Sequence, residues 1–99
     1  MIHVTGELLS PPTAALAREQ RELVRRLGLL VAWPPTARAW LITTSLRRLC
    51  RHGPMRVNAA LVDAATGVVN ESFTADLRPG AMAEVARAAA AKFLPKLAV

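Results

Sequence analysis

Apolar and polar residues alternate along the second half of the chain, and this period of two predicts three β-strands, at residues 39–49, 55–63 and 68–76. The residues expected to face inward in the first strand are Trp40, Ile42, Thr44 and Leu46, and those in the third are Val69, Phe73 and Ala75. Between the second and third strands, Asp63 can accept backbone N–H groups and Gly67 can adopt positive φ. The pattern therefore predicts an antiparallel meander of three strands.

Two other segments carry apolar residues at helical spacing and predict helices, at about 12–27 and 81–94. Pro11 suits the first position of a helix because its missing N–H would be unpaired there. Gly28 is expected to follow the first helix as its C′ residue, and Pro95 is expected to end the second.

Short apolar segments in the first half, Ile2 to Leu9 and Leu29 to Trp33, predict one or two N-terminal strands, although Gly6 weakens the first. Two helices can cover one face of a sheet of four or five strands. The predicted fold is therefore α+β, a two-layer sandwich formed by a single domain over residues 1–99.

The net charge of +6 is unevenly distributed, since residues 18–56 hold nine of the thirteen basic residues. Such a basic half indicates either an anionic partner or an ordinary solvated surface. Candidate polyanion-binding residues are Arg47, Arg48, Arg51 and Arg56. The first helix could bind a membrane surface through its arginine face, but Glu19 and Glu22 interrupt that face and its apolar stripe lacks Trp and Phe. Core packing is therefore the preferred interpretation of this helix.

Catalytic and metal-binding patterns are weak. Cys50 and His52, with His3 as a third ligand, lack the spacing of a zinc site. Cys50 lies beside basic residues, but no nucleophile signature or pair of carboxylates accompanies it. We expect no enzymatic activity, no catalytic residue, no metal and no cofactor.

The cell compartment is indicated only indirectly. No basic n-region precedes an apolar run at the start of the sequence, and no apolar stretch is long enough to span a bilayer. A single thiol fits a reducing compartment. We expect a cytoplasmic protein, or a periplasmic one if a leader has been removed.

One family resemblance covers about residues 38–97. Ser45-Leu46-Arg47-Arg48, followed by a hairpin and the segment from Arg56 to Gly67 (RVNAALVDAATG), resembles the TolB-like accessory domain. That domain is found beside bacterial adenylate cyclase and TPR modules, and secretion and transport lipoproteins use similar sheets. The resemblance implies a non-catalytic assembly module that binds protein through sheet edges and faces.

The preferred interpretation is a protein–protein interaction or assembly module that docks through a sheet edge or face, with a protein partner or a second copy of the chain. Small and mostly uncharged residues are expected on the face opposite the core, and the candidate partner-binding residues are Ala60, Val62, Asn70, Ser72 and Thr74. The alternative is a small basic nucleic-acid-binding subunit that uses the arginines named above.

Overall fold

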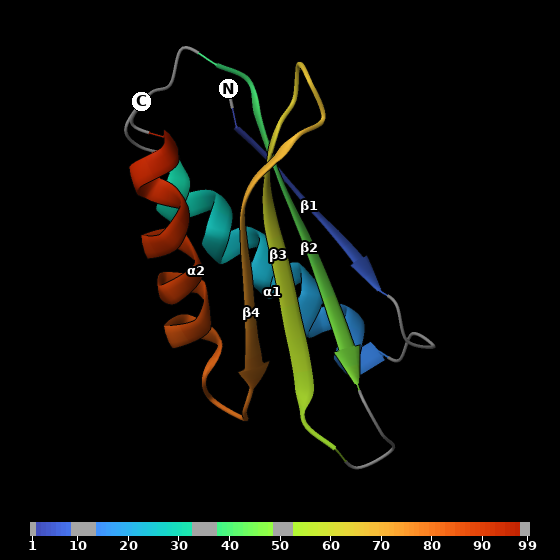
Figure 1. The fold of residues 1–99 in the computed structure, drawn as a ribbon. Coiled ribbons are helices and arrows are strands. Elements are labelled where there is room, and N and C mark those ends of the chain that lie inside the picture. The colour runs from blue at the N-terminus through green and yellow to red at the C-terminus, as the bar shows by residue number, and fades with distance from the viewer. Residues whose placement is uncertain (1, 9–13, 33–37, 49–52, 98–99) are drawn as a thin grey trace.

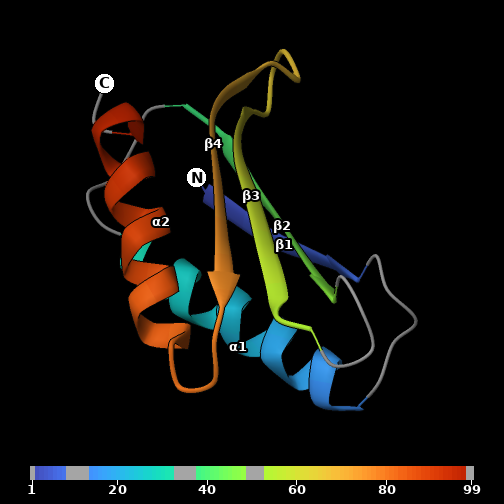
Figure 2. The same ribbon diagram turned by 60° about the horizontal axis from the view of Figure 1, so that its bottom comes forward.

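A computed structural model describes residues 2–8, 14–32, 38–48 and 53–97, which form one open sheet with two helices on one of its faces (Figure 1). The elements, in chain order, are β1 (Ile2–Leu8), α1 (Ala14–Val31), β2 (Trp40–Arg48), β3 (Met55–Asp63), β4 (Val69–Leu77) and α2 (Met82–Leu97). The second view shows the helices and the sheet as two layers (Figure 2). The predicted α+β class and the meander are confirmed.

The sheet is mixed, and its strand order follows the sequence, β1-β2-β3-β4. The strands from β2 to β4 pair antiparallel, whereas β1 pairs parallel to β2. A parallel pair needs a crossover connection, and α1 lies in the crossover between these two strands. The hairpin after β3 is the predicted one: Asp63 accepts the Ala65 N–H through its carboxylate at 2.9 Å, and Gly67 has φ of 74°.

The core lies between the sheet and the helices, and alternation along the strands determines which residues enter it. The inward side chains of β2 from Trp40 to Leu46 are buried, and the ones between them are only partly buried. The fully buried large side chains are Phe93, Leu23, Leu27, Ile42, Leu46, Leu61, Leu97, Val31 and Val57. Burial of each such side chain stabilises the fold by about 1.5–3 kcal/mol relative to exposure.

The predicted strand from Leu29 to Trp33 is wrong, because α1 continues through this segment to Val31. Val31 lies four residues beyond Leu27 and is buried with it, so the helical stripe continues one turn further than predicted. Gly28 is an interior helical residue rather than a C′ residue. Trp33 lies outside the described residues, and one N-terminal strand, β1, is present among those described.

The second helix also extends further than predicted, past Pro95 to Leu97. Proline lacks the N–H that would bond to the preceding turn, which destabilises the interior of a helix. Leu97, however, is only 1% exposed, and its burial offsets that loss in the last turn.

A β-bulge in β4 changes which face one predicted core residue occupies. The register shifts so that Leu61 pairs with Glu71 whereas the next residue, Val62, pairs with Val69. Val69 is therefore 56% exposed instead of facing inward, while Phe73 and Ala75 pack against the core as predicted.

A close approach between β1 and α1 explains why a glycine occupies position 6. A Cβ atom at this position would lie 2.0 Å from Nε2 of Gln20, a buried side chain of α1. That Nε2 donates a hydrogen bond to Thr44 Oγ1 at 2.8 Å, and the Thr44 hydroxyl donates to the Thr5 carbonyl at 2.6 Å. The glycine thus makes room for a polar chain that joins α1, β2 and β1.

Candidate functional site: the open face of the sheet

The second face of the sheet is left uncovered by the helices, and we call its β2–β4 surface the open face. Its side chains alternate with the buried ones along each strand. The outward residues are Leu41, Thr43, Ser45 and Arg47 on β2, Arg56, Asn58, Ala60 and Val62 on β3, and Val69, Ser72, Thr74 and Asp76 on β4.

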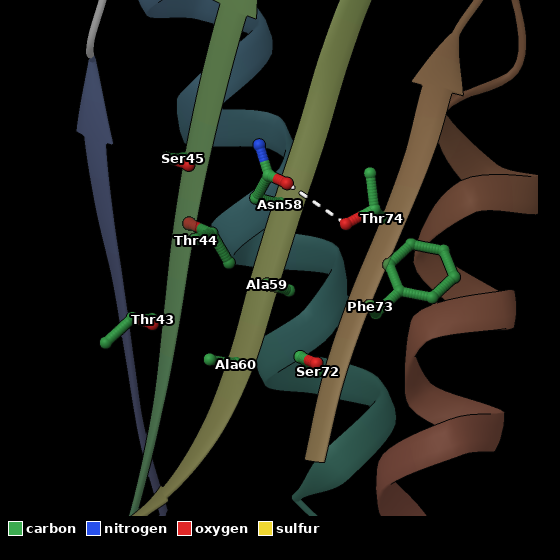
Figure 3. Close-up of a pocket in the computed structure, with 9 residues that line it drawn as sticks. All are labelled: Thr43, Thr44, Ser45, Asn58, Ala59, Ala60, Ser72, Phe73 and Thr74. Atoms are coloured by element: carbon green, nitrogen blue, oxygen red, sulfur yellow. Dashed lines mark hydrogen bonds between the residues drawn. The ribbon is translucent and has the colours of Figure 1, made fainter. Parts of the chain in front are cut away.

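The middle of the open face is a shallow concavity of about 280 Å³ with small, uncharged outward side chains (Figure 3). Ala60 lies between Thr43 and Ser72 in the register, and Asn58 lies between Ser45 and Thr74. The Thr74 hydroxyl donates to Asn58 Oδ1 at 3.0 Å. Short side chains of this kind allow another backbone or side chain to approach the sheet closely, with little rotamer entropy to lose.

One end of the open face is apolar. Leu41 pairs with Val62, and Val62 pairs with Val69 across the bulge. A concavity of about 360 Å³ lies at this end and extends to His3 on β1 and Gly67 in the hairpin. Val68, next to Val69, is also 56% exposed. Val69 and the hollow beside its partner Val62 thus present apolar surface that burial in a complex would remove from water.

The opposite end of the open face is charged. Arg47 and Arg56 are direct cross-strand partners, and Arg56 donates to Asp76 Oδ1 through Nε and Nη2, each at 3.4 Å. Arg48 donates to the Gly53 carbonyl at 3.3 Å instead. Arg51 lies outside the described residues. The structure thus brings two of the four candidate polyanion-binding arginines together, with an aspartate beside them.

Four of the five candidate partner-binding residues lie together on the open face: Ala60, Val62, Ser72 and Thr74. Asn70 is exposed at the bulge and has no partner in the β3–β4 register. The β2 side chains Thr43 and Ser45 complete the concavity. The alternation of β2 already places them opposite its buried residues, so this signal was available in the sequence.

Chemistry-bearing residues do not gather elsewhere in the part of the chain that the structure describes. No three His, Cys, Asp or Glu side chains there are arranged to hold a metal ion. Cys50 and His52 lie outside the described residues. No helix among the described residues has the length and hydropathy needed to cross a membrane.

Comparisons with known proteins show the fold alone. No protein-family model matches the sequence, and no curated protein matches it either. Several solved structures match at low identity, and the two that follow are among them. A candidate lipoprotein from Caulobacter crescentus CB15 is 19% identical with a TM-score of 0.58, covering 94% of this chain and 90% of its own. A point variant of PelC from Paraburkholderia phytofirmans, solved as a dodecamer, is 17% identical with a TM-score of 0.60. The match covers 97% of this chain and 85% of the PelC chain. The resemblance to the TolB-like domain stays a prediction.

Proposed function

We propose that this chain is a non-catalytic assembly module that associates with further copies of itself through the open face. The observation that carries the proposal is the uncovered face of the sheet. Its side chains are small and uncharged in the middle, and they are apolar at the end formed by Leu41, Val62 and Val69. Interface cores are depleted in charged residues and pack as closely as protein interiors. Burial of this face against a second copy would remove the exposed valines from water.

Likeness to proteins of known structure supports the same proposal. The PelC variant that shares the fold was solved as a dodecamer, and the TolB-like resemblance also implies an assembly role. The candidate lipoprotein with this fold supports the extracytoplasmic alternative over the cytoplasmic one.

Nucleic-acid binding is the less favoured function. Proteins that bind single strands stack bases on exposed aromatic side chains beside cationic ones. Phe73 packs toward the core and Trp40 is buried, so neither aromatic ring stands on the open face. Asp76 also offsets part of the positive charge that Arg47 and Arg56 supply.

Sedimentation velocity on a matched pair of variants tests the proposed assembly. Ser72→Arg places a long charged side chain in the middle of the open face, whereas Ala88→Arg adds the same side chain at an exposed position of α2. We expect the wild type and Ala88→Arg to sediment as oligomers and Ser72→Arg to sediment as a monomer. Monomers for all three proteins, or oligomers for all three, would contradict the proposal.

The nucleic-acid alternative is separated by fluorescence anisotropy with labelled oligonucleotides at about 50 and about 200 mM salt, where phosphate contacts lose most of their affinity. We expect no salt-sensitive binding. Tight binding that falls steeply with salt, and that weakens in Arg47→Gln, would favour that alternative instead.

A further inference from the structure

Positive charge in the described elements belongs to the helices rather than to the sheet. The two helices carry seven arginines and lysines against three glutamates. The four strands carry three arginines against four acidic residues. The basic residues of the helices are exposed or partly exposed, so the outer side of the helix layer is the cationic side of these elements.

Two leucines of the same layer are exposed to solvent, one largely and the other in part. Leu29 is 67% exposed and Leu30 is 37% exposed, both in the last turn of α1. Beside them lies a concavity of about 260 Å³ between α1 and α2, which also receives Arg25 and Arg26 from α1 and Arg87 from α2. We call these two leucines and three arginines the helix groove.

One carboxylate, that of Glu22, pairs with two of the three guanidinium groups of the helix groove. Glu22 accepts from Arg25 at 2.6 and 3.0 Å and from Arg26 at 2.7 Å. Arg87 forms no ion pair with any other described residue. The groove therefore keeps an excess of two positive charges. The hydrogen bonds from Arg25 lower the pKa of Glu22 to about 2, so the carboxylate stays ionised and this excess does not vary near neutral pH.

The sequence pattern of the first helix disfavours a membrane-surface role, but it does not show that α2 adds Arg87 to the same concavity as Arg25 and Arg26. We infer that the helix groove docks the protein onto the surface of an anionic lipid bilayer. Arg25, Arg26 and Arg87 contact lipid phosphates, and Leu29 and Leu30 insert at the boundary of the acyl chains. Exposed leucines beside a row of arginines are the two features by which an interfacial helix binds such a surface. A soluble phosphate ion would engage the arginines but would leave the leucines in water, whereas a bilayer satisfies both groups.

This docking does not depend on the proposed self-association, because it uses the opposite layer of the molecule. The residues of the open face lie on β2, β3 and β4, whereas those of the helix groove lie on α1 and α2. An oligomer formed through the open face would still present its helix grooves. Variants at the two surfaces can therefore fail separately.

Co-sedimentation of the full chain with vesicles tests the inference. We expect binding to vesicles of phosphatidylcholine mixed with phosphatidylglycerol, weaker binding at high salt, and little binding to phosphatidylcholine alone. The double variant Leu29→Ser and Leu30→Ser should weaken binding about tenfold or more, since it removes the inserted apolar area. Both leucines are exposed, so the variant should keep the fold, which circular dichroism checks.

Charge variants make the test independent of folding defects. Arg87→Gln should weaken binding about fivefold, and Glu22→Gln should strengthen it by a similar factor because it removes the one carboxylate. Arg38→Gln removes the same charge outside the two helices and should change binding less than Arg87→Gln. The inference is overturned if the wild type does not bind anionic vesicles, if the double leucine variant binds as well as the wild type, or if Arg38→Gln and Arg87→Gln behave alike.

Discussion

The open face and the helix groove are both exposed, yet the chain builds them from different side chains. The open face has small hydroxyl, amide and methyl groups in its middle and valines at one end. The helix groove has long arginines around two leucines. Short side chains allow a protein surface to approach closely, whereas long cationic ones bridge to a charged boundary. The two layers of one small domain are thereby suited to different partners.

The largest expected effect separates the two faces of a single strand. Leu61 is fully buried against the helices, and Val62, the next residue of β3, points to the open face. In the Ser72→Arg background, where the chain should be monomeric, Leu61→Ala should lower the free energy of unfolding by about 3 kcal/mol and Val62→Ala by about 1 kcal/mol or less. Urea denaturation measures both. Equal losses would mean that the open face is already covered within one chain.

The next effect tests how closely α1 packs on the covered side. Gly6→Ala should lower the free energy of unfolding by about 1–3 kcal/mol, because its Cβ would displace the Gln20 amide from Thr44. Measured again in a Gln20→Ala background, the same substitution should cost clearly less, since the two nearest atoms belong to Gln20 and only Val24 Cγ2, at 3.0 Å, remains. An unchanged loss of free energy of unfolding would mean that the destabilisation does not arise from the contact with Gln20.

A smaller effect on stability should accompany a clear effect on assembly at Val69. Because this side chain is 56% exposed, Val69→Ser should change the free energy of unfolding of the monomer by about 0.5 kcal/mol or less. It should nevertheless weaken self-association in sedimentation velocity, because the apolar end of the open face loses area. If Val69→Ser assembled as well as the wild type, the apolar end of the open face would not be part of the interface.

The smallest effect concerns pH and the helix groove. The folded-state pKa of Glu22 is lowered from 4.5 to about 2, so its stabilising contribution is present above pH 4.5 and is lost as the pH falls toward 2. Wild type should therefore exceed Glu22→Gln in melting temperature by a small, constant margin at neutral pH, and the margin should vanish near pH 2. Thermal melts at a series of pH values test this, and a margin that persists at pH 2 would point to another cause.

Sequence pattern predicted the sheet better than it predicted the ends of the helices. Alternation identified β2 and β3 and the face on which Ala60, Ser72 and Thr74 lie, because a period of two fixes the face of every residue in a regular strand. The segment at Leu29 was misassigned because a short apolar run fits a buried strand as well as a helix end, and only tertiary packing of Val31 decides.

The other differences have equally local causes. Regular alternation back from Phe73 places Val69 in the core. This prediction is wrong because a bulge shifts the register by one residue, and nothing in the alternation of β4 marks the bulge. The helix groove could not be predicted, since Arg87 approaches Arg25 and Arg26 only through the packing of α2 against α1. Extending the first helix to Val31 is what exposes Leu29 and Leu30 beside them.

Methyl NMR on the wild-type protein tests the division between the two surfaces most directly. On raising the protein concentration, the methyl signals of Ala60, Val62 and Val69 should shift or broaden while those of Leu29 and Leu30 stay unchanged. Adding anionic vesicles should then affect the two leucines. Concentration-dependent changes at the leucines, or none at the open-face methyl groups, would contradict the account.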